Sequence, residues 1–161
     1  MIRKDSGYFW LISGLLVLAV VVYTIIDFNQ AQAEINEASL LEATSTSEVK
    51  PYDSGTFSKI SYSFLIQLSP DMTKQDIGQI KIQTIFPEEA IHILGHSASG
   101  INQGGLKEVN EEKGMYEYQY SFGGDHLTEA DLTRLQELAP LVQLNLSYKK
   151  KDVILSYNGD S

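Results

Sequence analysis

Two kinds of hydrophobic pattern divide the chain. The run from Gly7 to Ile26 is twenty residues long and contains no charged residue. From about residue 57 onward, apolar residues alternate with polar ones in short segments. A continuous apolar run is typical of a membrane-spanning helix, because about 20 residues cross the roughly 30 Å hydrocarbon core of a bilayer. Alternation at period two instead predicts half-buried β-strands.

The charges beside the apolar run predict its orientation. Arg3 and Lys4 precede it, Asp27 follows it, and the next basic residue is Lys50. Because positive charges stay on the cytoplasmic side, residues 1–6 are expected to form a cytoplasmic tip. The chain is therefore expected to be a single-pass cell-membrane protein whose C-terminal domain lies outside the cytoplasm.

Two other interpretations of the N-terminus stay open. Residues 31–33 read Ala-Gln-Ala, the small-residue spacing at which a signal peptidase cleaves, so residues 7–26 could be a signal peptide that is removed after Ala33. Lys4, Gly7 and Tyr8 loosely resemble the leader of type IV pilin-like proteins, although Ile12 stands where such leaders carry a glutamate. The first alternative also places the domain outside the cytoplasm.

Residues 27–56 show no regular apolar period. They are rich in Ala, Gln, Glu, Ser and Thr, and the second half contains Pro51 and Gly55. This composition predicts a helical stalk up to about Ala43, followed by a flexible linker. The folded domain is then expected to cover residues 57–161.

The remaining chain contains about seven segments with the character of strands. They are residues 60–68, 79–86, 90–96, 106–110, 115–122, 142–148 and 152–157. Residues 111–114 have the length and the final glycine of a hairpin turn. A single helical turn is expected within residues 69–78, where Ser69 and Pro70 resemble a helix start.

Segment 90–96 is ambiguous. Ile91, His92 and Ile93 alternate as in a strand, whereas Pro87 and Gly95 would equally frame a short helix. We expect a strand, because five apolar positions are too few to support an isolated helix.

One substantial helix is expected between Thr128 and Ala139. Thr128 is a good N-cap, three leucines follow at helical spacing, and Pro140 prevents continuation. Seven strands and one helix in about 100 residues predict a mainly β fold, an immunoglobulin-like or fibronectin-like β-sandwich.

Composition narrows the function. The formal net charge is −9, and all of this negative excess lies from Ala31 onward, where the sequence contains 19 acidic and 10 basic residues. Such a surface repels phosphate backbones and argues against a nucleic-acid partner. The chain has no cysteine, which excludes disulfides and thiolate metal sites and is typical of a bacterial envelope protein rather than a small eukaryotic ectodomain.

Candidate chemical groups are few. His92 and His96 could share a metal only on a helix, because in a strand they lie roughly 13 Å apart. Asp125, His126, Glu129 and Asp131 crowd the start of the predicted helix, where acidic residues are expected from the helix dipole alone. Lys149–Lys151 is the one basic run and is expected at a hairpin tip. We therefore predict no catalytic set, no metal and no cofactor.

These features predict a membrane-anchored binding or accessory module that contacts another protein. The alternatives are a secreted or anchored hydrolase that uses acidic residues, and a pilin-like assembly component. Loops on a rigid scaffold often carry the binding residues. The predicted contact residues are a glycine-framed loop and two tyrosines on the adjacent strand: Ile101, Asn102, Gln103, Tyr116 and Tyr118.

Overall fold

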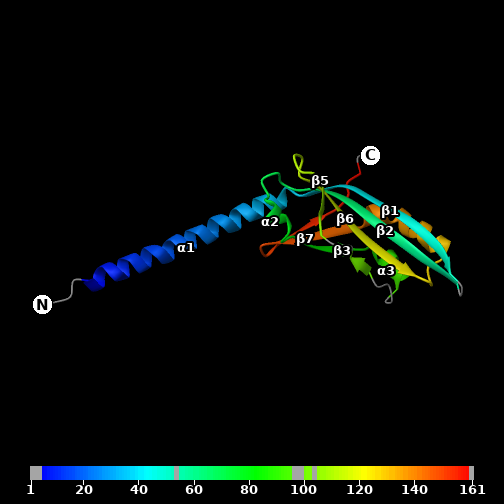
Figure 1. Ribbon diagram of the computed structural model, residues 1–161, viewed down its shortest axis with the longest axis horizontal. Coiled ribbons are helices and arrows are strands. Elements are labelled where there is room, and N and C mark those ends of the chain that lie inside the picture. Colours follow the sequence, from blue (N-terminus) through cyan, green and yellow to red (C-terminus); the bar gives the residue numbers. More distant parts are fainter. Residues whose placement is uncertain (1–4, 53–54, 96–99, 103–104, 160–161) are drawn as a thin grey trace. The chain divides into compact units, whose positions relative to one another are not determined.

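The computed structural model describes residues 5–52, 55–95, 100–102 and 105–159 (Figure 1). Within these ranges, the side chains at residues 5–12, 28–34, 52 and 100–102 lie outside the description. The chain divides into two compact units, Met1–Ala33 and Glu34–Ser161, here called unit 1 and unit 2. Each unit is described by itself.

Helix α1 covers Asp5–Asn36 and makes up nearly all of unit 1. Its large apolar side chains between Leu15 and Ile26 are exposed by 46% to 70%. In the part of the chain that the structure describes, no helix combines the length and apolar character needed to cross a membrane.

Unit 2 is built mainly from two antiparallel sheets, here called sheet A and sheet B, so the predicted mainly β fold is confirmed. Sheet A has the order β1-β2-β6-β4, and β5 also pairs with β6. Its strands are β1 (Ser39–Tyr52), β2 (Gly55–Gln67), β4 (Gly100–Asn102), β5 (Lys107–Asn110) and β6 (Met115–Gly124). The immunoglobulin-like or fibronectin-like type of sandwich stays a prediction.

Sheet B has the order β3-β7-β8. Its strands are β3 (Lys81–Ile85), β7 (Gln143–Tyr148) and β8 (Lys151–Leu155). Among the described residues, four short helical segments lie between the strands: α2 (Lys74–Ile77), α3 (Glu88–Leu94), α4 (Glu129–Glu137) and the 3₁₀ turn η1 (Ala139–Leu141).

The core follows from the predicted alternation. Every second residue of β2 from Ile60 to Ile66 is fully buried, as are Leu144 and Leu146 of β7. Phe86, which follows β3, packs edge-on against Phe122 of sheet A with ring centroids 5.1 Å apart. Burial of each large apolar side chain contributes about 1.5–3 kcal/mol, so this inner face supplies much of the stability of unit 2.

Residues 39–52 form strand β1 rather than the end of a stalk and a linker. They pair with β2 from Ser39 opposite Gln67 to Tyr52 opposite Gly55, with one irregularity near Leu40. β1 lies at the edge of sheet A, where a proline and charged side chains are tolerated because one side of the strand needs no partner. Pro51 and Lys50 are therefore edge-strand features.

Residues 88–94 form helix α3, so the predicted strand is wrong. Pro87 precedes the helix in an extended conformation, and Gly95 ends it with φ +64°. Ala90 and Leu94, four residues apart, are both buried on one face of the helix. Packing of this face supplies the support that an isolated helix of this length would lack.

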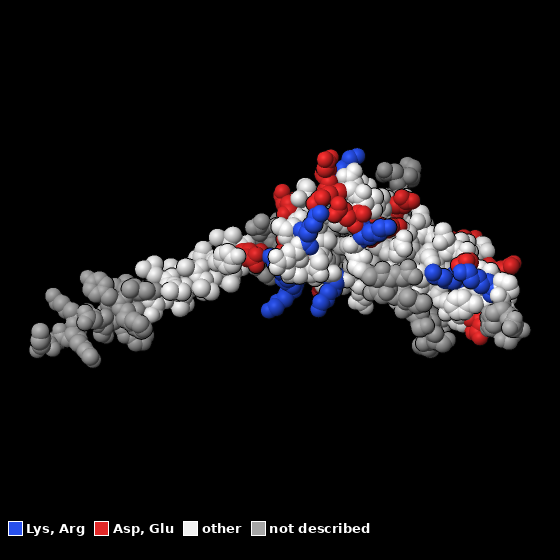
Figure 2. Space-filling view, viewed as in Figure 1, with Lys and Arg blue, Asp and Glu red and all other residues white. Residues whose placement is uncertain are grey.

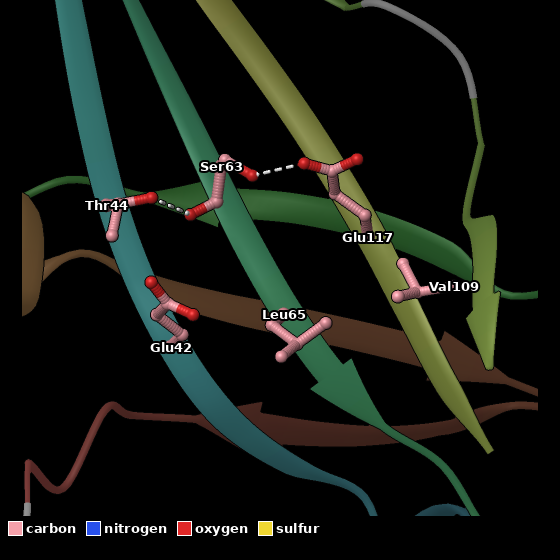
Figure 3. Close-up of a pocket in the computed structure, with 6 residues that line it drawn as sticks. All are labelled: Glu42, Thr44, Ser63, Leu65, Val109 and Glu117. Carbon is pink, nitrogen blue, oxygen red and sulfur yellow. Dashed lines mark hydrogen bonds between the residues drawn. The ribbon is translucent and has the colours of Figure 1, made fainter. Parts of the chain in front are cut away.

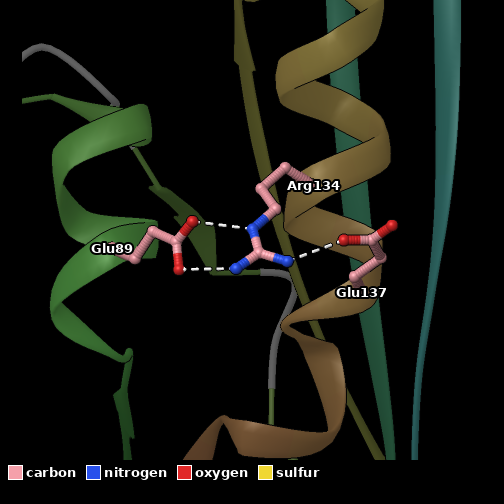
Figure 4. A network of polar contacts seen from close by, with 3 residues as sticks. All are labelled: Glu89, Arg134 and Glu137. Atoms are coloured by element: carbon pink, nitrogen blue, oxygen red, sulfur yellow. Dashed lines mark hydrogen bonds and ion pairs between the residues drawn. The ribbon is translucent and has the colours of Figure 1, made fainter.

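An ion-paired network joins α3 to α4 (Figure 4). The Arg134 guanidinium donates from Nε to Glu89 Oε1 at 2.6 Å and from a terminal nitrogen to Glu89 Oε2 at 2.9 Å. Its other terminal nitrogen donates to Glu137 at 2.8 Å. The hydrogen bond from Arg134 lowers the pKa of Glu89. These side chains are about half exposed, so the network fixes the geometry of the helix pair more than it stabilises the fold.

Helix α4 confirms the predicted helix. Thr128 is its N-cap, and a capping box joins Thr128 to Asp131, whose carboxylate accepts from the Thr128 backbone N–H at 2.9 Å. Leu132 and Leu135 are buried beneath sheet A. The Ser58 hydroxyl of β2 donates to the Leu127 carbonyl at 2.8 Å and so fixes the start of the helix to the sheet.

Replacing Thr128 with Ala should lower the free energy of unfolding by about 1 kcal/mol, because the cap hydrogen bonds are lost. Urea unfolding of the full chain in detergent measures this. Thr133→Ala, in the exposed middle of the same helix, is the matched control and should change stability by less than about 0.5 kcal/mol. Equal effects of the two substitutions would contradict the capping role.

Candidate functional site

The outer face of sheet A carries a hollow of about 320 Å³ (Figure 3). Four neighbouring strands line it: β1 contributes Glu42 and Thr44, β2 contributes Ser63 and Leu65, β5 contributes Val109, and β6 contributes Glu117. Ser63, Leu65 and Glu117 alternate along their strands with buried residues, so they lie on the face of sheet A that points away from the core. The hollow is therefore a product of the sheet register.

The register places these residues in two rows across the sheet. Leu65 pairs with Glu42 on one side and with Glu117 on the other. In the adjacent row, Ser63 pairs with Thr44 and Gln119. Since adjacent strands lie about 4.8 Å apart, the backbones of Glu42 and Glu117 are roughly 10 Å apart with Leu65 between them.

Glu117 is held in its charged form. Its Oε1 atom accepts a hydrogen bond of 2.6 Å from the Ser63 hydroxyl and one of 3.0 Å from the Gln119 amide. These two bonds lower the pKa of Glu117, the one from Ser63 most strongly. The carboxylate is therefore a fixed negative charge near neutral pH, with acceptor capacity remaining on its oxygens.

The shape of the hollow suits a side chain that has an apolar stem and a cationic head. Leu65 and Val109 supply apolar surface, and the Val109 side chain is 54% exposed. Glu42 and Glu117 supply the negative charge on either side. Lysine and arginine combine such a stem with such a head.

Hydrolytic chemistry receives little support from this geometry. A general acid needs a pKa raised towards neutral, and the pKa of Glu117 moves the other way. The Ser63 hydroxyl donates to that carboxylate, and no histidine is among the six residues that line the hollow. Ser63 therefore lacks the neighbouring imidazole that activates a serine nucleophile.

A second hollow of about 240 Å³ lies between α2 and β5. Lys74 on its rim is paired with Glu108 at 3.4 Å and with Glu111 at 3.1 Å. The one cation that lines this hollow is thus already neutralised. Ile77, Ile80 and Leu106 form the apolar part of the wall.

The two predicted contact tyrosines belong to the core. Tyr116 is 6% exposed and Tyr118 is 2% exposed. Tyr118 stacks on Phe64 with ring centroids 6.2 Å apart, and burial raises its pKa. They share the inner face of sheet A with the buried residues of β2, so their rings do not form an outer contact surface.

The predicted contact loop lies partly outside the described residues. The backbones of Ile101 and Asn102 form β4, opposite Ser121 and Tyr120 of β6. Their side chains and the whole of Gln103 lie outside the description.

The histidines and acidic residues that the sequence singled out are exposed, take part in local hydrogen bonds or lie outside the described residues. His92 is exposed on α3, and His96 lies outside the described residues. Asp131 serves the cap of α4, and His126 Nε2 lies 3.3 Å from the Leu94 carbonyl oxygen. Among the residues that the structure describes, no group of three or more histidines or carboxylates could hold a metal ion.

Sequence reasoning missed Glu42, Thr44 and Val109. Ser63, Leu65 and Glu117 could be assigned to an outer face from alternation alone. Glu42 and Thr44 were assigned to the stalk and linker, and which strands lie beside β2 depends on long-range pairing. The polar alternation of Glu42, Thr44 and Thr46 was the available signal.

Comparisons with protein-family models, with curated proteins and with solved structures give no significant match.

Replacing Ser63 with Ala should raise the pKa of Glu117 towards its ordinary value, because the strongest hydrogen bond to the carboxylate is lost. Carbon-13 NMR titration of the Glu117 carboxyl measures this. Ser61→Ala, which removes a hydroxyl that bonds Ser121 on the same strand face, is the control and should leave that pKa unchanged.

The same substitution should alter the acid dependence of stability. A pKa lowered by folding stabilises the protein above the unfolded value, and this contribution is lost as pH falls through the folded value. Ser63→Ala should therefore lose less stability than the wild type on acidification. Unchanged behaviour in both measurements would contradict the assigned role of Ser63.

Proposed function

We propose that this protein is a single-pass, membrane-anchored binding module whose β unit contacts another protein outside the cytoplasm. The observation that carries this proposal is the apolar surface of α1. Ten large apolar side chains between Leu15 and Ile26 are exposed by 46% to 70%, and they point in all directions around the helix. A helix that is apolar all round needs lipid or protein around it.

Covering the apolar surface of α1 gives a large gain in free energy. Burying one large apolar side chain contributes about 1.5–3 kcal/mol, so covering this surface is worth on the order of 10 kcal/mol. The uncharged run in the sequence continues towards Gly7, beyond Ser13 where the described side chains begin. Its total length fits a bilayer, and Arg3 and Lys4 favour a cytoplasmic N-terminus.

Signal-peptide cleavage remains the alternative for the N-terminus. The boundary between the compact units falls between Ala33 and Glu34, which is also where the Ala-Gln-Ala spacing predicts cleavage. A cleaved chain would keep unit 2 complete. Both forms place unit 2 outside the cytoplasm, the first at the membrane and the second released from it.

Binding is favoured over catalysis by the electrostatics of the outer face. Glu117 is a fixed charge rather than a proton donor, and it lies on a rigid sheet beside Leu65 and Val109. Such a surface recognises a basic side chain of a partner by charge complementarity. The predicted contact residues Ile101, Asn102 and Gln103 are a second proposed contact. A wall component would be a second kind of ligand, and a pilin-like assembly role would instead use α1 as a packing element.

Charged residues in the middle of α1 should abolish membrane retention. Leu18→Arg with Val22→Arg places two cations at the centre of the run, each costing about 2.5–3.5 kcal/mol on insertion. The double variant should be extracted by alkaline carbonate, whereas the wild type and the control Leu18→Val with Val22→Leu should stay with the membrane. Release of the wild type by carbonate would contradict the anchor.

Protease accessibility tests the orientation. Protease added to spheroplasts should degrade the chain after Glu34 and leave the N-terminal end protected. A protected unit 2 would mean that the orientation is reversed.

Removing the charge of Glu117 should weaken partner retention. Glu117→Gln keeps the size and the acceptor atom but removes the charge, so a charge-assisted hydrogen bond of about 1.5–3 kcal/mol becomes a neutral one of about 0.5–1.5 kcal/mol. Partner recovery should therefore fall roughly fivefold or more. Co-purification from detergent-solubilised membranes measures this. Glu112→Gln, an exposed acid in the β5–β6 turn, is the matched control. If Glu117→Gln leaves partner recovery unchanged while Ile101→Asp abolishes it, the contact is made by residues 101–103 and not by the hollow.

A further inference from the structure

The turn between β7 and β8 has an unusual backbone for its residues. Tyr148 pairs with Lys151, so Lys149 and Lys150 form a two-residue turn. Their φ angles are +44° and +65°. Turns with two positive φ angles favour Asn-Gly, because side chains such as lysine are strained in this region. Two consecutive lysines therefore lie at positions that Asn or Gly would occupy with less strain.

The turn is held firmly against α2. The Tyr148 hydroxyl, buried with its ring, donates to Asp76 Oδ1 at 2.6 Å. Lys149 Nζ lies 4.0 Å from the same oxygen and 5.2 Å from the centroid of the Tyr148 ring. Lys150 is exposed and Lys151 is partly exposed. The lysines are thus presented by a fixed scaffold.

The turn lies at the end of unit 2 where this unit begins (Figure 1). Ser39, the first residue of β1, pairs with Gln67 of β2. Leu68, which follows Gln67, donates its N–H to the carbonyl of Gly114 in the β5–β6 turn at 2.9 Å, so this turn lies beside the start of β1. Lys74 of α2 contacts Glu111 of that turn at 3.1 Å. Asp76 of α2 then contacts Lys149.

The charge at this end contrasts with the rest of unit 2. Beyond Ala31 the chain has 19 acidic and 10 basic residues, and three of the ten are consecutive in Lys149–Lys151, here called the lysine turn. Figure 2 shows acidic side chains on several parts of the visible face of unit 2, including the region near α2 and β5, and basic side chains that project at the end near α2. An anionic surface would attract the lysine turn and repel most of the remaining unit.

We propose that the lysine turn contacts anionic lipid headgroups of the membrane that holds α1. This inference rests on the proposed membrane anchor. The uncharged run ends at Ile26 and β1 begins at Ser39, and the ten residues 27–36 between them continue α1 over about 15 Å. A tilt of this segment would bring this end of unit 2 to the headgroups. Basic residues near a membrane gain roughly fivefold in surface affinity per lysine when anionic lipids are present. The turn therefore orients unit 2 on the membrane.

The test uses the full chain in vesicles. The sequence contains no cysteine, so Asp152→Cys on β8 gives a unique site for a fluorophore next to the turn. Nitroxide groups on lipid headgroups quench the fluorophore when the turn is near them. Vesicles of phosphatidylcholine alone are compared with vesicles of three parts phosphatidylcholine and one part phosphatidylglycerol.

We expect stronger quenching with phosphatidylglycerol, reversed by high salt. Lys150→Gln and Lys151→Gln should each reduce the ratio of surface-bound to free turn roughly fivefold. Lys50→Gln, which removes an exposed lysine near the other end of β1, is the matched control and should leave the quenching unchanged. Lys150→Gly removes the charge and the strained φ together, so it should reduce quenching while keeping or raising the urea midpoint.

The outcomes separate this inference from the proposed function. A chain that carbonate extracts from both kinds of vesicle overturns the anchor and this inference with it. A chain that stays inserted, but is quenched equally in the two lipids or is unaffected by Lys150→Gln and Lys151→Gln, overturns this inference alone.

Discussion

The structure depends on the two different faces of strand β2. Its even-numbered residues from Ile60 to Ile66 are fully buried, whereas Ser63 and Leu65 on the other face line the outer hollow. β2 is paired on both sides, with β1 and with β6, so its register sets the faces of both neighbours. A slip by one residue would turn the buried set to solvent and the hollow into the core. The core and the candidate site are therefore fixed by the same pairing.

Local signals explain what could be predicted from the sequence. The alternation at 60–68 and 142–148 marked the strands correctly, because each strand buries one face only. Thr128 and Asp131 marked the start of α4, because a capping box uses groups three residues apart. In each case the information lies within a few consecutive residues. These elements needed no knowledge of their neighbours.

The errors arose where a segment depends on distant contacts. β1 buries little more than Leu40 and Ala43, so its sequence has no strong apolar period, and its pairing with β2 decides its structure. Helix α3 is too short to form alone, and it is supported by burial of Ala90 and Leu94 and by the clamp from Arg134. The tyrosines of β6 are a different case. Their alternation with Glu117 and Gln119 already separates the two faces of the strand, and the burial of Tyr116 and Tyr118 shows that their face packs in the core.

The chemistry of the hollow follows from where its hydrogen bonds lie. General acid catalysis by a carboxyl group requires a proton that can be given up and regained near neutral pH. Ser63 and Gln119 donate to Glu117 and so stabilise only its ionised form. A charge that is fixed in this way on a paired strand needs no rearrangement before it meets a cation, and this pre-organisation reduces the entropy lost on binding. The hydrogen bonds that keep Glu117 deprotonated, and so unsuited to donate a proton near neutral pH, are therefore the ones that suit it to recognition.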